Sequence, residues 1–275
     1  MVIEFEPRLR MLGSNMTAEG LHLFHTRERL IWASFHCIVG SLLFTLTLCG
    51  YLLKNSMICA NPELRSYMAH LEAGRPFDLE EATLAVYNGT SHTTPRFIQV
   101  HENWVQWIGG KIHAPLRRTQ HTALLINGQI AECSERAQIL KTIAEKHGHL
   151  CRFVGLGGHV VLEVAMDHVW HVADPEFGLT FPVSITKLSD QNREASIIEA
   201  LRRRNIHEEQ ISNYLHILQS EKDNTRLRIG EAISPRLELI ENISGWLTWL
   251  IPLACYISAL GYFISARSGT CSASL

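Results

Sequence analysis

The sequence predicts an α+β domain that is flanked by two transmembrane helices. Two stretches of 24 and 21 residues carry no Asp, Glu, Lys or Arg, and the segment between them shows helical and strand-like hydrophobic patterns in turn. A helix rises about 1.5 Å per residue, so about 20 apolar residues cross the hydrocarbon core of a membrane. We therefore expect both uncharged stretches to span a bilayer and the middle segment to fold outside it.

The uncharged stretches are residues 30–53 and 246–266. Buried helices of soluble proteins are usually shorter and carry a polar stripe. Trp246 and Trp249 begin the second stretch, where aromatic residues commonly mark the membrane interface. Basic residues flank both ends of the spans in nearly equal number, so the usual dominance of the first helix decides the orientation. It places both termini in the cytoplasm and the middle segment in the periplasm.

The chain therefore divides into five parts. They are an N-terminal tail (1–29), a first span (30–53), a folded domain (54–243), a second span (244–266) and a C-terminal tail (267–275). With 25 basic and 27 acidic residues, the chain has no polycationic region that would bind nucleic acid. The expected partners are the lipid bilayer and a substrate of the folded domain.

Local patterns assign secondary structure within the folded domain. Apolar residues recur with a helical period after Cys133 until Gly148 ends the pattern, and two alternating runs surround a short turn at Asp167 and His168. The predicted elements are helices at 62–73, 133–147, 194–222 and 226–241, a strand at 151–156, and a β-hairpin of strands 159–166 and 169–174.

Three residues of these elements form a candidate catalytic triad. Cys133 opens a helix, where free N–H groups and the helix dipole favour a thiolate. His159 begins one strand of the hairpin and Asp174 ends the other, and a two-residue turn places both on the same sheet face. Each residue alone is more often structural. We expect the helix to pack against the His159 face and so to align thiol, imidazole and carboxylate.

The segment from Gly128 to Gly178 resembles the core of the transglutaminase-like proteins, of a bacterial membrane-anchored type. The matching motifs are Cys133 at a helix start, G-x-x-x-R ending at Arg152, H-x-x-x-E-V from His159, and W-x-x-x-D-P from Trp170 to Pro175. Two positions depart from the pattern. Ala131 stands where a Gly is common, and Val161 stands where many members have Trp.

The resemblance implies a papain-like α+β core in which a helix carrying Cys packs on an antiparallel sheet carrying His and Asp. It implies a Cys133 nucleophile, a His159 base, an orienting Asp174, and acyl transfer from a peptide or protein amide through a thioester. Similar proteins are peptidases, deamidases or acyl transferases, and some have lost activity. An inert membrane scaffold therefore remains an alternative. So does an arylamine acetyltransferase-like enzyme, although no feature of the sequence favours one.

The sequence predicts neither a metal site nor a cofactor. His147 with His149, or His168 with His171, could form pairs of ligands, but no Cys or carboxylate at a matching spacing accompanies either pair. The seven cysteines form no disulfide framework. Cys59 and Cys151 could pair if the domain is periplasmic, because that compartment is oxidising.

Overall fold

A computed structural model describes residues 18–55, 61–92, 95–128, 131–190, 193–220 and 224–271. The chain forms two compact units. The first, here the helical unit, contains the parts of two long helices up to Cys49 and from Ser244. The second, here the α+β unit, runs from Gly50 to Ile243. Each unit is described separately.

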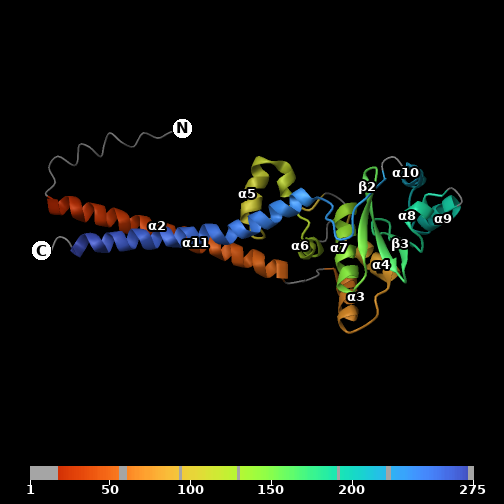
Figure 1. Ribbon diagram of the computed structural model, residues 1–275, viewed down its shortest axis with the longest axis horizontal. Helices are drawn as coiled ribbons and strands as arrows, with labels where there is room; N and C mark the ends of the chain where they lie inside the picture. Colours follow the sequence, from red (N-terminus) through yellow and green to blue (C-terminus); the bar gives the residue numbers. More distant parts are fainter. Residues whose placement is uncertain are drawn as a thin grey trace. The chain divides into compact units, whose positions relative to one another are not determined.

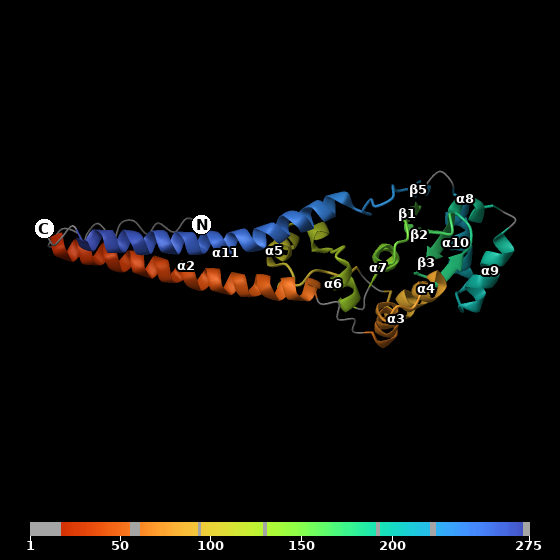
Figure 2. The same cartoon turned by 60° about the horizontal axis from the view of Figure 1, so that its bottom comes forward.

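The long helices are α2 (Ala18–Asn55) and α11 (Pro235–Cys271). Within the helical unit they lie side by side and antiparallel (Figures 1 and 2). The Arg29 guanidinium donates to the Ser265 carbonyl at 2.8 Å, and the Thr47 hydroxyl donates to the Thr248 carbonyl at 2.7 Å. Because the residue numbers rise along α2 as they fall along α11, the helices run in opposite directions.

Both helices are long and apolar enough to span a membrane, over Leu23–Asn55 and Pro235–Ser268. Their outer surfaces are apolar as well: Leu42 is 63% exposed and Ile257 is 63% exposed. An apolar surface of this extent is unusual on a soluble protein and is typical of a surface that meets lipid. Both helices are longer than the uncharged stretches because polar residues extend them.

The α+β unit contains an antiparallel sheet with the strand order β4-β3-β2-β1-β5. This observation confirms the predicted α+β class. Its helices are α3 (Pro62–Glu72), α4 (Leu79–Gly89), α5 (Trp104–Ile112), the 3₁₀ helix η2 (Ala114–Arg117), α6 (Thr122–Gly128), α7 (Cys133–Lys146), α8 (Ile185–Leu188), α9 (Glu194–Arg203) and α10 (Glu208–Gln219). Its strands are β1 (Cys151–Leu156), β2 (His159–Met166), β3 (Val169–Asp174), β4 (Leu179–Phe181) and β5 (Asn224–Arg226).

The central hairpin joins β2 and β3 through the predicted two-residue turn. Asp167 and His168 have φ values of 48° and 66°, the left-handed conformation that a type I′ turn requires at both positions. Met166 pairs with Val169 and Leu162 pairs with Ala173. This register places Asp174 opposite Val161. Val161 and His159 are two residues apart on β2, so His159 and Asp174 lie on the same face of the sheet.

The two faces of the sheet are covered by different helices. Leu162 and Val164 pack with α7 residues such as Ile139 and Leu140. Val161, on the alternate face, packs with residues of α8, α9 and α10. Figures 1 and 2 show α7 on one side of the sheet and α8–α10 on the other.

The expectation that the Cys133 helix covers the His159 face is therefore wrong. The apolar side chains of β2 alternate with His159 and Glu163, so the apolar stripe of α7 packs on the face that His159 does not occupy. The Cys-His-Asp residues meet at one end of the sheet instead, because α7 and β2 begin there and β3 ends there.

Two other predicted elements differ from the structure. The helix expected at 194–222 is divided into α9 and α10 around Asn205, whose φ of 58° is incompatible with a continuing helix. The helix expected at 226–241 begins only at Pro235. The chain before it forms β5, which pairs with β1 through Arg226 and Val154 and completes the sheet edge.

Candidate active site

Cys133 is the first residue of α7 and follows a helix cap made by two glutamates. The Glu132 N–H donates to the Glu135 carboxylate at 3.0 Å, and the Arg96 N–H donates to the same side chain at 3.3 Å. Burial raises the pKa of Glu135. The cap fixes where the helix begins, so the Cys133 side chain lies in the first turn, where the helix dipole favours negative charge.

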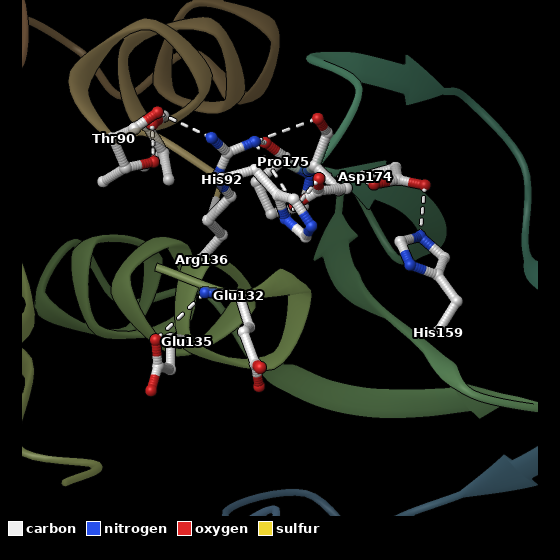
Figure 3. Close-up of polar contacts among 10 residues, drawn as sticks. Thr90, His92, Glu132, Glu135, Arg136, His159, Asp174 and Pro175 are labelled. Atoms are coloured by element: carbon white, nitrogen blue, oxygen red, sulfur yellow. Dashed lines mark hydrogen bonds and ion pairs between the residues drawn. The ribbon is translucent and has the colours of Figure 1, made fainter. Parts of the chain in front are cut away.

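His159 and Asp174 form a buried hydrogen-bonded pair (Figure 3). His159 Nε2 lies 2.8 Å from Asp174 Oδ2, and the carboxylate is fully buried. The other carboxylate oxygen accepts the Glu176 N–H at 3.0 Å. Both oxygens of Asp174 are therefore engaged, and the bond to Nε2 leaves Nδ1 of His159 for another partner.

Cys133 lies close enough to His159 to affect its charge. Burial of His159 disfavours the imidazolium, but the Asp174 carboxylate and the nearby Cys133 outweigh it and raise the pKa of His159 to about 10. The structure thus brings the three predicted residues together in the order thiol, imidazole, carboxylate. A charged imidazolium beside a thiol stabilises the thiolate and gives a nucleophile a proton donor for a leaving group.

Arg136, one turn after Cys133, connects three segments at the site (Figure 3). It is 3% exposed, and its guanidinium donates to the Thr90 carbonyl at 2.6 Å and to the Glu176 carbonyl at 3.0 Å. It also forms an ion pair of 3.3 Å with the Glu176 carboxylate. Arg136 therefore holds the chain after Asp174 against the helix that begins with Cys133. Sequence reasoning missed it, although its i+3 spacing from Cys133 places it on a neighbouring helix face.

Two aromatic residues cover the imidazole on the side away from α7. Phe177 and Tyr214 have ring centroids 5.7 Å and 5.9 Å from that of His159. Burial and the adjacent Asp174 raise the pKa of the Tyr214 phenol well above 10, so the phenol stays neutral. Together the rings exclude water from the His159–Asp174 pair. Tyr214 belongs to no motif around Cys133, His159 or Asp174, because it lies on α10, about 40 residues after Asp174 in the chain.

An open groove of about 440 Å³ borders this site. Its wall includes Phe177, which contacts the imidazole, and Tyr87, Thr90, His92 and Glu176. His92 Nδ1 lies 2.7 Å from the Glu176 carboxylate. Burial raises the pKa of Glu176. The wall of the groove mixes aromatic and hydrogen-bonding side chains.

The remaining motif residues form a structural cluster on the same face of the sheet. Glu163 is fully buried and accepts from Arg152 Nε at 2.7 Å and from the Ile185 N–H at 2.7 Å. The Arg152 guanidinium lies 4.2 Å from the ring centroid of Trp170. The cluster crosses β1, β2 and β3 and attaches α8 to them, so these motif positions stabilise the sheet.

One of the two histidine pairs of the sequence packs against an aromatic ring. His147 stacks on Phe77 and His149 lies tilted against it, with ring centroids 6.0 Å and 4.7 Å away. Among the described residues, no group of three or more His, Cys, Asp or Glu side chains could hold a metal ion. Cys151 is buried as a free thiol, and burial raises its pKa to about 12. Cys59, its suggested disulfide partner, lies outside the described residues.

Comparison with other proteins adds no family or homologue to these observations. A scan against models of known protein families finds no match for this chain, and a search of curated proteins finds none either. Function is therefore inferred from the residues of the chain and from the geometry in which they meet.

Proposed function

We propose that this chain is a membrane-anchored thiol enzyme of transglutaminase-like type, which acts on an amide bond through a thioester at Cys133. The observation that carries the proposal is the position of His159, bonded at 2.8 Å to buried Asp174 on one ring nitrogen and close enough to Cys133 for each to affect the charge of the other. A thiol, an imidazole and a buried carboxylate in this order are the groups that a thiol acyl-transfer mechanism uses.

The reaction follows from these positions. The Cys133 thiolate attacks the carbonyl carbon of the amide, and the His159 imidazolium gives its proton to the departing amine. The products of this step are a free amine and an acyl thioester on Cys133. His159, now neutral, accepts a proton from water or from an acceptor amine, which attacks the thioester. Collapse of that adduct releases a carboxylic acid or a new amide and returns the Cys133 thiolate.

The two long apolar helices support a double membrane anchor with the α+β unit on one side of the bilayer. We place that side in the periplasm and the substrate, a peptide or protein amide, close to the membrane surface. A double anchor would restrict the enzyme to substrates within its reach, which suits a substrate that is itself attached to the membrane.

An activated ester tests the chemistry without knowledge of the natural substrate. The full chain in lipid nanodiscs is mixed with p-nitrophenyl acetate, and release of p-nitrophenol is followed together with the mass of the protein. We expect a burst, an acetyl group on Cys133 and slow turnover. Cys133→Ala should abolish the adduct, and His159→Ala should slow acylation about 10²-fold. Cys151→Ala, at a buried thiol, is the matched control and should acylate normally.

Two outcomes would contradict the enzyme. A chain whose Cys133 reacts with iodoacetamide but forms no acyl adduct would be an inert scaffold. Equal acylation of the wild type and of His159→Ala would remove His159 from the mechanism. Sidedness is measured separately, by labelling Cys133 in intact cells with a membrane-impermeant maleimide. Labelling is expected if the α+β unit is periplasmic, and labelling only after lysis would reverse the orientation.

A further inference from the structure

The pair formed by α5 and η2 presents apolar side chains to the outside of the α+β unit. Ile108 and Ile112, one helical turn apart, are 48% and 86% exposed. Phe97, whose ring centroid lies 6.0 Å from the Arg117 guanidinium of η2, is 43% exposed. Single exposed apolar residues need no explanation, but two isoleucines on one face of a helix form an exposed apolar surface.

The opposite face of α5 is packed, so the exposed face is fixed in direction. A Cβ atom at Gly110 would lie 2.6 Å from Arg117 Cγ, which shows how closely η2 approaches α5. The Arg117 side chain donates to the Gly110 carbonyl at 2.9 Å and closes the pair. Because Gly110 is about half a turn from Ile108 and Ile112, these two side chains lie on the outer surface.

Both ends of this segment are attached to the parts of the long helices that enter the α+β unit. A Cβ atom at Gly50, in the last two turns of α2, would collide with the Glu102 carbonyl. The Gln120 N–H donates to the Glu241 carboxylate, in the first turns of α11, at 2.9 Å. All of these residues belong to one unit. The α5–η2 pair is therefore held where both candidate spans end.

The charged and aromatic residues of the segment around α5 also suit contact with a lipid headgroup layer. Residues 95–121 contain four Lys or Arg and a single acidic residue, Glu102, which forms a buried ion pair with Arg96. Lys111 is exposed, and its ammonium lies 4.6 Å from the ring centroid of Trp107 on the same helix. A short helix with apolar residues on one side, Trp beside them and Lys able to extend to phosphate is typical of an interfacial anchor.

We propose that α5 lies in the headgroup layer of the bilayer and inserts Ile108 and Ile112 toward the acyl chains. This inference rests on the membrane anchor of the proposed function. It adds a third contact with the membrane, which fixes the orientation of the α+β unit. The entrance of the groove beside His159 is then held at one height above the membrane, which favours substrates displayed at that height.

A fluorescent probe tests the contact in the full chain. Dansylalanine is incorporated in place of Ile112 or, as the matched control, in place of Val169, which is 48% exposed at the β2–β3 turn. Both chains are reconstituted into vesicles of phosphatidylcholine with and without phosphatidylglycerol. Lipids with a nitroxide near the headgroup then quench the probe. We expect quenching at position 112 to be at least about threefold stronger than at position 169, with a blue-shifted emission.

The outcomes separate the two proposals. Equal quenching at the two positions in a chain that stays with the vesicles would overturn the α5 contact and leave the anchor intact. A probe at 112 that is shielded from water but not quenched by lipid would also overturn it, because a protein partner would then cover α5. A chain that does not stay with the vesicles would overturn both the anchor and the contact. Stronger quenching with phosphatidylglycerol would support the role of Lys111.

Discussion

One face of the sheet carries two ion pairs with fully buried carboxylates that differ in the cation. The Arg152–Glu163 pair crosses β1 and β2, and the His159–Asp174 pair joins the start of β2 to the end of β3. Both have a fully buried carboxylate, and both have a nitrogen–oxygen distance below 3 Å, 2.7 Å and 2.8 Å respectively.

The difference lies in the cation. The Arg152 guanidinium cannot lose its proton at physiological pH and is stacked on Trp170. The His159 imidazole can lose its proton, and Cys133 lies close enough to affect the charge of the ring. The Arg152–Glu163 pair is therefore a fixed structural support, whereas the His159–Asp174 pair can carry a proton. Burial and pairing alone therefore do not mark a reactive site; an exchangeable proton beside a nucleophile does.

The largest effect is expected from breaking the fixed pair. Glu163→Ala leaves the Arg152 charge and the Ile185 N–H without their partner, which should cost about 3–5 kcal/mol of folding free energy. Thermal unfolding in detergent micelles measures the change. Glu199→Ala is the matched control, because Glu199 pairs with Arg203 at an exposed position and should shift the midpoint little. Equal shifts for the two variants would show that the Glu163 pair is not a structural support.

The next effect is on rate. Asp174→Ala removes the group that raises the pKa of His159, so the imidazolium is no longer favoured at neutral pH. Alkylation of Cys133 by iodoacetamide at pH 7 should slow about 10–100-fold. Folded Glu163→Gln, with the shape of the side chain kept, should alkylate at the wild-type rate. If both variants slowed alkylation alike, the contrast between the two pairs would be false.

A smaller effect is expected at Arg136, which positions Asp174 without touching the reacting atoms. Arg136→Met keeps much of the buried volume but removes the bonds to Thr90 and Glu176. We expect alkylation of Cys133 to slow about tenfold and its pH profile to shift, because the His159–Asp174 distance is no longer fixed. Arg136→Lys should restore part of the rate, since one ammonium can reach one of the carbonyls. A loss of stability with an unchanged pH profile would assign Arg136 a purely structural role.

The sequence predicted the elements that depend on local residues, and it failed where tertiary contacts decide. The helix after Cys133, the hairpin and its turn at Asp167 and His168 depend on neighbouring residues, and their patterns were sufficient. The face of the sheet that α7 covers depends on tertiary packing. The alternating pattern of β2 shows which face is apolar, but it does not show which helix covers that face. β5 pairs with β1 across about 70 residues of chain, and three residues are too few to show an alternating pattern.

The candidate site shows a similar division. The sequence predicted Cys133, His159 and Asp174 as site residues because each lies at the end of a helix or strand. Together they also follow the Cys-His-Asp order of the transglutaminase-like motif. Arg136 and Tyr214 could not, because a polar residue on a helix and a tyrosine on a distant helix have many ordinary roles. Their functions depend on contacts that only the folded chain creates.

The last prediction concerns the pH dependence of stability, and it distinguishes the two pairs directly. The pKa of His159 is about 10 in the folded chain and 6.5 for an isolated histidine, so folding favours its protonated form. The stabilisation is therefore complete below about pH 6.5 and is lost as the pH rises through about 10. The stability difference between wild type and His159→Gln should shrink between about pH 6 and pH 10.5, when unfolding is measured at both values. The difference between wild type and Glu163→Ala should stay constant over this range, because Arg152 keeps its charge throughout. A His159→Gln difference that stayed constant or grew would show that the imidazole is held neutral, and Cys133 would then need another source of the proton for its leaving group.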